Sequence, residues 1–465
     1  MIPISYRIRV IGLHAKTRYH LWIIWIVVEV PEARFVTSYS FEVGEDFACK
    51  LDLKDPLAGF RQRFYVPEGA VYLDGNSLGL LSKESESAVL RALNDWKRLG
   101  IRGWLEASNP WFYLAEDLGA KCAALVGARP DEVVATGSTT VNIHSLVNTF
   151  YRPVANRKKI LGDELNFPTD TYALRSAVKL RGLDPEENLI LASSKDGRLL
   201  DEADVVGLMN DDVALVFLPS VLYRSGQLLD MEYLSEEAHS RRILIGFDCS
   251  HSVGVVQHHL DKWEVDFAVW CSYKYLNGGP GSTAFLYVNK KHFEHEPSLA
   301  GWFGYVKDKQ FDMALGFEHA KSAGGWQISS PNILSLAALE GSLEIIHEAG
   351  IEAIRKKSLK LTSYLMYLVD ETLSESPYNF SVGAPRESER RGGHVALEHE
   401  EGTRISEALR SRNVIPDFRP PNIIRVAPTP LYNTYHEIWK LTNHLRDIID
   451  RNDYSKYSKE RKRIS

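Results

Sequence analysis

The sequence predicts an α/β protein, in which a large domain with a mostly parallel sheet covered by helices on both faces precedes a smaller α+β domain at the C-terminal end. Two observations predict this architecture. Between about residues 82 and 288, helical periodicity alternates with short apolar runs that end in Gly, Asp or Ser. Continuous apolar strands suit a sheet that is covered on both faces, and their alternation with helices indicates parallel βαβ units. After about residue 331, a long helical stretch leads into a different pattern of short strands and helices.

The expected elements follow the apolar pattern. In the large domain, we expect strands at residues 132–135, 214–218, 243–247 and 267–270. In the smaller domain, we expect a helical stretch from 333 to 349 and on to 373, a strand at 393–397, a helix at 402–411, a strand at 423–426 and a last helix at 435–450. The expected domains are an N-terminal extension (1–46), a large domain (47–330) whose N-terminal segment contributes to the small domain, a small domain (331–452) and a polar tail (453–465).

Length and composition describe an enzyme-sized globular chain. Of its 465 residues, 44% are hydrophobic and 25% are charged, which excludes disorder, collagen and coiled coil. Lys and Arg number 55 against 61 Asp and Glu, and the net charge of -6 provides no strong positive field for nucleic acid or anionic lipid. We therefore expect no nucleic-acid partner, and a small ligand that is held by local charges.

The four cysteines lie far apart, without any Cys-x-x-Cys spacing. This pattern argues against a zinc site or a disulfide scaffold, so no metal is expected, and it suits the reducing cytoplasm. The cysteines are Cys49, Cys122, Cys249 and Cys271.

The apolar run at residues 21–28 is too short to cross a membrane, because a span takes about 20 residues. Basic residues precede this run, as in a signal peptide, but no small-residue cleavage site follows, and Glu29 and Glu32 come soon after it. We therefore expect a β-rich extension, or a translation start assigned too early, rather than a targeting signal.

Asp248 and Lys274 are the strongest candidates for chemistry. Ligands of open parallel sheets bind at the carboxyl ends of strands. Asp248 ends the run at 243–247, and Lys274 follows the run at 267–270. A lysine between two tyrosines at such a position is partly desolvated, which lowers its pKa and favours a Schiff base, and a neighbouring carboxylate could keep a pyridine nitrogen protonated. Singly, Lys274 could be a lysine that reaches solvent and Asp248 a helix cap, but together they favour a cofactor site.

Three further segments could complete such a site. Residues 136–141 lie between a strand and a helix, where backbone N–H groups and hydroxyls face an anion, although an ordinary helix cap explains them as well. The segment at 166–170 offers an aromatic face and an acid, with turn chemistry as the alternative. His251 could hydrogen-bond Asp248 or a cofactor, or be a capping or core histidine.

Arg425 lies in an apolar strand of the small domain. A buried guanidinium is costly unless it meets a carboxylate. A substrate carboxylate and a structural Asp or Glu are equally good candidates for that partner.

From about Phe47 to Asp450, the chain resembles the kynureninase family, whose members are pyridoxal-phosphate enzymes of the aspartate-aminotransferase fold (fold type I). Two strings are highly specific, namely Tyr-Leu-Asp-Gly-Asn-Ser-Leu-Gly at 72–79 and Trp-Cys-Ser-Tyr-Lys-Tyr-Leu-Asn at 270–277. Further matching segments are 166–170, 246–254, 301–304 and 425–433. An Asp followed by a Schiff-base Lys is shared by the whole fold type and does not by itself identify the family.

The resemblance implies hydrolytic cleavage of the Cβ–Cγ bond of L-kynurenine to anthranilate and L-alanine, by a hydrolase acting on carbon–carbon bonds in ketonic substances. It implies that Lys274 binds pyridoxal phosphate covalently, and Tyr273 is the candidate proton relay. It also implies a homodimer with sites at the subunit interface, where Trp302 and Ser330 would reach the neighbouring subunit's cofactor. The other implied roles are ring contacts by Asp248 and Phe167, phosphate contacts by Thr139, Thr140 and Tyr273, further cofactor contacts by Asp170 and His251, and α-carboxylate binding by Arg425.

Three positions depart from the family pattern. Trp104 replaces a histidine, and Ser330 an asparagine, that members favouring 3-hydroxykynurenine carry; both changes remove partners for a ring hydroxyl. An unpaired hydroxyl in a buried pocket costs about 1–3 kcal/mol, so we expect 3-hydroxykynurenine to be the poorer substrate. Pro219 stands where a serine near the cofactor is common.

Two other functions stay open. One is another lyase of the same fold type, such as a cysteine desulfurase-like enzyme, although those enzymes use a cysteine on a mobile loop and Cys271 is expected in a buried strand. The other is a catalytically idle pyridoxal-phosphate-binding dimer, against which Lys274, Asp248 and Arg425 count.

Overall fold

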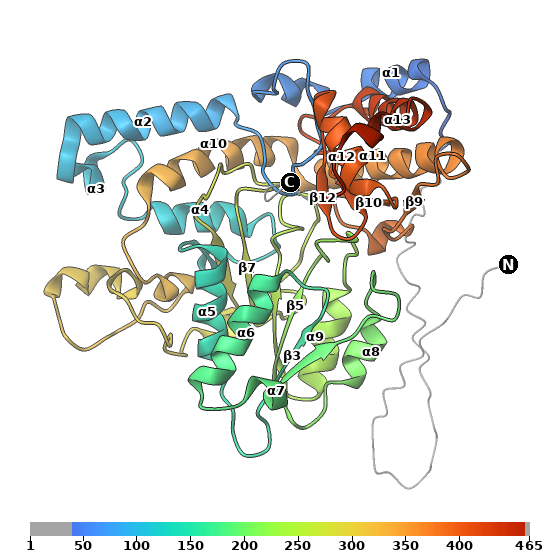
Figure 1. Ribbon diagram of the computed structural model, residues 1–465. Coiled ribbons are helices and arrows are strands. Elements are labelled where there is room, and N and C mark those ends of the chain that lie inside the picture. Colours follow the sequence, from blue (N-terminus) through green and yellow to red (C-terminus); the bar gives the residue numbers. More distant parts are fainter. Residues whose placement is uncertain (1–39, 461–465) are drawn as a thin grey trace, which may run out of the picture. The chain divides into compact units, whose positions relative to one another are not determined.

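The computed structural model describes residues 40–460 (Figure 1). The expectations for residues 1–39, including the β-rich extension and the apolar run at 21–28, lie outside the described residues, as do the last five residues of the expected polar tail.

Seven strands form the central sheet, in the order β2-β8-β7-β6-β5-β3-β4. Neighbours from β4 to β7 run parallel, whereas β8 runs antiparallel to both β7 and β2. The predicted mostly parallel sheet is therefore confirmed. The strands are β2 (Val133–Ala135), β3 (Lys159–Asp163), β4 (Leu189–Ala192), β5 (Val213–Pro219), β6 (Leu244–Asp248), β7 (Phe267–Trp270) and β8 (Phe285–Val288).

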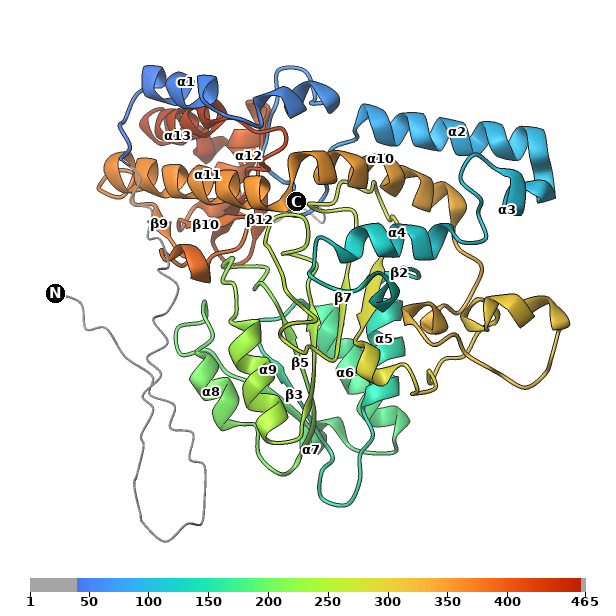
Figure 2. The ribbon, with the colours of Figure 1, turned by 180° about the vertical axis from the view of Figure 1, so that it is seen from behind.

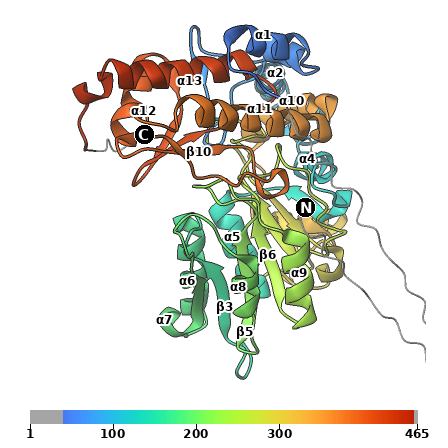
Figure 3. The same ribbon diagram turned by 90° about the vertical axis from the view of Figure 1, so that its right-hand side faces the viewer.

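Helices cover both faces of this sheet. Figure 3 shows α5 and α6 on one side of the strands and α8 and α9 on the other. Phe150 of α5 stacks on Phe267 of β7 with 4.9 Å between ring centroids, so an aromatic contact joins helix and sheet. The helices are α5 (Thr139–Phe150), α6 (Pro168–Leu180), α7 (Pro185–Asn188), α8 (Glu202–Gly207) and α9 (Met231–Ser240).

A second group of helices packs in sequence against the sheet's β2 edge: α4 contacts β2, α10 contacts α4, and α2 contacts α10 (Figure 2). Gly341 makes the α2–α10 contact possible, because a Cβ there would lie 2.3 Å from the carbonyl carbon of Glu84. The helices are α2 (Lys83–Leu99), α3 (Gly103–Glu106), α4 (Leu114–Ala123) and α10 (Ile333–Ala349).

The helical stretch expected from 333 to 373 divides into two helices. Helix α10 ends at Ala349, and α11 (Ile351–Thr372) begins beyond Gly350. The φ of Gly350 is +76°, a left-handed conformation that ends a helix at little cost only for glycine. The apolar pattern continues on both sides of this residue, which is why the sequence shows one stretch.

The C-terminal part forms a four-stranded antiparallel sheet, in the order β12-β13-β10-β9, that packs with α11, α12 and α13. Segments from the beginning of the described chain join it: α1 (Glu45–Leu53) packs on α13, and β1 (Val71–Tyr72) pairs in parallel with β11 (Val414–Ile415). The other elements are β9 (Ser381–Val382), β10 (Val395–Glu398), α12 (Gly402–Ser411), β12 (Asp417–Arg419), β13 (Ile423–Val426) and α13 (Tyr435–Asp450). Between residues 40 and 460, no helix has the length and apolarity needed to span a bilayer.

Candidate active site

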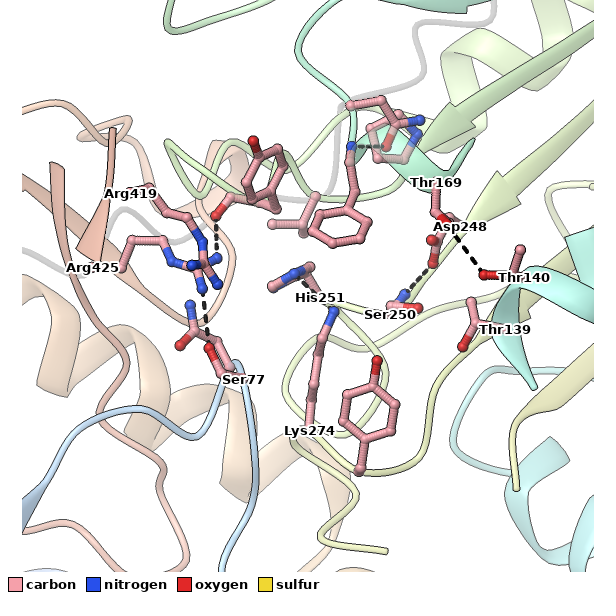
Figure 4. A pocket seen from close by; sticks show the side chains of 17 residues that line it. Ser77, Thr139, Thr140, Thr169, Asp248, Ser250, His251, Lys274, Arg419 and Arg425 are labelled. Atoms are coloured by element: carbon pink, nitrogen blue, oxygen red, sulfur yellow. Dashed lines mark hydrogen bonds between the residues drawn. The ribbon is translucent and has the colours of Figure 1, made fainter. Parts of the chain in front are cut away.

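A cavity of about 220 Å³ lies where the carboxyl ends of β5, β6 and β7 approach the first turn of α5 and two arginines of the C-terminal sheet (Figure 4). This is the edge of a parallel sheet where ligands usually bind. The cavity brings together Thr139, Thr140, Phe167, Asp248, His251, Tyr273, Lys274 and Arg425 from the sequence-based expectations.

Lys274 projects into the middle of this cavity (Figure 4). Its Nζ lies 2.9 Å from Nε2 of His251 and 6.0 Å from the ring centroid of Tyr273. Burial, followed by the positive charges of Lys274 and Arg425, holds the pKa of His251 well below its usual range. The imidazole is therefore neutral, and Nε2 accepts a hydrogen bond from the lysine amine.

Two carboxyl groups lie together beside the cavity. The Asp248 Oδ1 accepts a hydrogen bond from the backbone N–H of Ser250 at 2.8 Å, so Asp248 caps a turn as well as lining the cavity. Asp170 is fully buried and forms no hydrogen bond of normal geometry with the described residues, although Asn166 and Asp248 lie near enough to affect its pKa.

The proton of this pair resides on Asp170. Burial and then the negative charge of Asp248 raise the pKa of Asp170 well above its usual range. Burial also raises the pKa of Asp248, but the positive charge of Lys274 opposes the change. Asp248 therefore carries the negative charge that faces the cavity.

The first turn of α5 forms one end of the cavity. Thr139 and Thr140 begin this helix, and the side chain of its N-cap, Ser138, makes no capping hydrogen bond within residues 40–460. The N–H groups of the first turn can therefore bind an anion, which the helix dipole favours. The Thr140 Oγ1 lies 3.3 Å from the Oγ1 of Thr169, so several hydroxyls gather at this end.

Phe167 and Tyr223 form an aromatic wall. Their ring centroids are 5.4 Å apart and their planes meet at 89°. Phe167 remains 47% exposed, so one face of its ring is open to a flat ligand.

Arg425 lies on the opposite side of Lys274 from the α5 turn (Figure 4), and its side chain is 1% exposed. Its Nε donates to Oδ2 of Asp417 at 2.6 Å, and Nη2 also contacts this oxygen. Nη1 donates to the carbonyl of Tyr223 at 2.7 Å, and Nη2 to Oγ of Ser77 at 3.1 Å. The structural carboxylate that the sequence left open is therefore Asp417. The guanidinium also lines the cavity, so binding of a substrate carboxylate stays a prediction.

Tyr223 and Arg419 also line the cavity, although neither was expected. Tyr223 lies in the loop after β5, and Arg419 ends β12, which pairs with the strand that carries Arg425. The Arg-Pro-Pro-Asn turn at 419–422, between two short apolar runs, could have indicated this hairpin and placed the two arginines close together.

Trp104, Trp302 and Ser330 do not line this cavity in their own chain. Trp104 packs against Trp111 and Phe303, with ring centroids 6.0 and 5.8 Å away. Trp302 is 45% exposed, and Ser330 is exposed. Within the part of the chain that the structure describes, no group of three or more His, Cys, Asp or Glu side chains could hold a metal ion.

Comparison with solved structures defines the class of protein. The apo structure of a cysteine desulfurase from Thermococcus onnurineus NA1 is similar with a TM-score of 0.72 at 18% identity, covering 89% of this chain and 99% of that chain. A C-DES mutant with glycine covalently linked to its PLP cofactor gives a TM-score of 0.72 at 15% identity, covering 83% and 99%. At these identities the likeness shows the fold, which is fold type I of the pyridoxal-phosphate-dependent enzymes, as predicted.

Sequence comparison then defines the family. The kynureninase of Geobacillus thermodenitrificans (strain NG80-2) is 54% identical over 430 residues, which cover 92% of this chain and 100% of that protein. A family model for the kynureninase C-terminal domain matches residues 354–445. The chain belongs to the kynureninase family, and the predicted family and cofactor are confirmed.

The cavity fits pyridoxal phosphate on its own chemistry. His251 Nδ1 and the two carboxyl oxygens of Asp170 are buried polar atoms without a well-formed hydrogen bond to any described residue. The first turn of α5 offers N–H groups and hydroxyls for an anion. A flat ring that carries a nitrogen, a hydroxyl and a phosphate offers partners for all of these groups.

Proposed function

We propose that this chain hydrolyses the Cβ–Cγ bond of L-kynurenine to give anthranilate and L-alanine, with pyridoxal phosphate as cofactor. One observation carries the proposal: the amine of Lys274 projects into a single cavity between the charged carboxylate of Asp248 and the guanidinium of Arg425. The family of the chain supplies the reaction.

Groups on the β-sheet side of the cavity would hold the cofactor. Thr139, Thr140 and Tyr273 would bind its phosphate, and Phe167 would stack on its ring. Asp248 would bind the ring nitrogen, with Asp170 and His251 completing the surroundings, and Lys274 would be the point of attachment. The bound cofactor supplies an electron sink that stabilises negative charge on the substrate carbons next to the amino group.

Arg425 would bind the α-carboxylate of the substrate. The contacts with Asp417, Tyr223 and Ser77 use four of its five N–H groups and fix the plane of the guanidinium. This fixed guanidinium lines the cavity, and Nη1 has one further N–H for a substrate oxygen.

Lys274 would move the proton of the substrate Cα. Its Nζ is within hydrogen-bond distance of Nε2 of neutral His251, which orients the amine without taking a positive charge itself. The amine takes the proton from Cα, as a positioned general base does.

Tyr273 would act at the ketone. Burial raises the pKa of its hydroxyl above the usual value, so the phenol keeps its proton at neutral pH. It can donate this proton to the γ-carbonyl oxygen while a water molecule adds to the γ-carbon. The Cβ–Cγ bond then breaks, the γ-carbon leaves as the carboxyl group of anthranilate, and Cβ takes a proton to become the methyl group of alanine.

We further propose a homodimer in which Trp302 and Ser330 reach the partner's cavity and Trp104 lies near the substrate ring. Their exposure, or their packing away from the cavity of their own chain, supports this arrangement. Large exposed apolar side chains on α2 and just beyond it offer a surface for a second copy; they include Leu90, Trp96, Ile101 and Leu105, at 59%, 58%, 80% and 70% exposure.

With Trp104 and Ser330 in place of groups that would pair a ring hydroxyl, the site would favour kynurenine over 3-hydroxykynurenine. The free cysteines are consistent with a cytoplasmic enzyme of tryptophan catabolism or of the kynurenine route to NAD. None of the four cysteines is exposed, so no observation favours a desulfurase.

The proposal is tested by incubating the purified protein with pyridoxal phosphate and L-kynurenine. We expect anthranilate fluorescence, with alanine formed in equal amount, and no product from the Lys274→Ala variant. Lys262→Ala, whose side chain is 74% exposed, is the matched control and should keep full activity. Absence of anthranilate, or full activity of Lys274→Ala, would overturn the proposal.

A further inference from the structure

An outer chamber of about 460 Å³ adjoins the active-site cavity. Phe167, Tyr223 and Arg419 line both spaces, so the chamber lies directly beside the site where the reaction would occur. Its other lining residues are Pro168, Arg224 and Pro420.

The charge of this chamber is one-sided. Two guanidiniums and no carboxylate are among its described lining residues. The Arg419 Nη2 lies 3.2 Å from Oδ2 of Asp417, the same oxygen that Arg425 contacts, so one carboxylate faces two guanidiniums. The chain as a whole carries a net charge of -6, so this local positive charge is not a general property of its surface.

Arg224 is the less committed of the two arginines. It lies in the loop that follows β5, and its Nε is buried without a hydrogen-bond partner among residues 40–460. It does not line the inner cavity. A planar guanidinium in this state is suited to bind a carboxylate through paired N–H groups.

The remaining walls are flat and apolar. The half-exposed ring of Phe167 meets Tyr223 edge to face, and two prolines complete the lining. Aromatic faces next to a guanidinium fork suit a ligand that combines a ring with a carboxylate.

We propose that the outer chamber binds the aromatic carboxylate product as it leaves the active site. This inference rests on the proposed function. Hydrolysis turns the neutral aryl ketone of the substrate into an aryl carboxylate, because the γ-carbon gains the oxygen of water and its acid ionises at neutral pH. The aromatic end of the substrate lacks this charge, so the chamber distinguishes product from substrate.

The test is direct binding to the protein loaded with pyridoxal phosphate, followed by titration calorimetry. Benzoate and anthranilate are the probes, and benzamide is the uncharged control. Arg224→Gln should weaken the binding of both carboxylates about fivefold to tenfold, since one charge-assisted contact is lost at a partly open site. Benzamide should bind the unchanged protein at least about tenfold more weakly than benzoate.

Matched variants separate the chamber from general effects. Arg451→Gln removes one charge from a side chain that is 69% exposed, and should leave benzoate binding unchanged. Arg224→Lys keeps the charge but loses the fork, and should give an intermediate affinity. Arg224→Gln should keep kcat and KM for L-kynurenine while relieving inhibition by anthranilate, because Arg224 lies outside the inner cavity.

Three results would overturn the inference: equal benzoate affinity in Arg224→Gln and the unchanged protein, benzoate binding without anthranilate binding, or displacement of benzoate by L-alanine, which would place it in the inner cavity. Failure to release anthranilate from L-kynurenine is a different outcome. It would refute the proposed function while leaving the benzoate titration as it stands.

Discussion

Replacing Asp248 with asparagine removes the negative charge that would face the cofactor's ring nitrogen. Protein surrounds Asp248 except toward the cavity, so its charge acts in a medium of low polarity. Two unit charges about 4 Å apart interact with about 4 kcal/mol at an effective dielectric constant of about 20. Since about 1.4 kcal/mol corresponds to a factor of ten, Asp248→Asn should lower kcat roughly a thousandfold.

Shape and binding should change much less, because asparagine can still accept the hydrogen bond from the N–H of Ser250. The assay is anthranilate release under single-turnover conditions, with cofactor retention followed by absorbance after gel filtration. Asp211→Asn, a change at a fully exposed side chain, is the control and should keep the normal rate. A rate within tenfold of the unchanged protein, with the cofactor retained, would refute the assignment of Asp248 to the ring nitrogen.

Three further predictions concern substrate binding, pH and specificity. Arg425→Gln should raise KM for L-kynurenine roughly a hundredfold with a smaller change in kcat, because charge-assisted hydrogen bonds to the α-carboxylate are lost; steady-state kinetics check this, and an unchanged KM would contradict it. Burial raises the pKa of Asp163 to about 7, so above pH 7 the folded state holds a costly charge that the unfolded chain ionises already near pH 4. Asp163→Asn should therefore gain about 3 kcal/mol of unfolding free energy relative to the unchanged protein between pH 4 and pH 8, and equal differences at both pH values in denaturant titrations would argue against this. The double variant Trp104→His with Ser330→Asn should raise the kcat/KM ratio of 3-hydroxykynurenine to kynurenine tenfold to a hundredfold, and a ratio that stays constant would exclude these positions.

The sequence predicted the parts of the site that follow strand periodicity. The apolar run at 267–270 is β7 itself, and the run that Asp248 closes is β6, so the positions of Asp248 and Lys274 at strand ends could be deduced without coordinates. The first turn of α5 was found in the same way, because Thr139 and Thr140 follow a short apolar run directly.

The rest of the site depends on tertiary contacts that periodicity does not reveal. Tyr223 lies in an irregular loop, and its carbonyl meets Arg425 across more than 200 residues of sequence. Asp417 pairs with Arg425 through the register of an antiparallel hairpin, so the sequence left a structural and a substrate carboxylate equally open. The proton on Asp170 follows from its burial beside Asp248, and burial of a single acid cannot be deduced from its neighbours in sequence.

The attachment of the cofactor to Lys274 is the central claim, and one chemical measurement tests it directly. The protein loaded with pyridoxal phosphate is reduced with sodium borohydride, digested, and mapped by mass spectrometry. A pyridoxyl group fixed on Nζ of Lys274 is the predicted result. A pyridoxyl group on another lysine, or on none, would contradict the account.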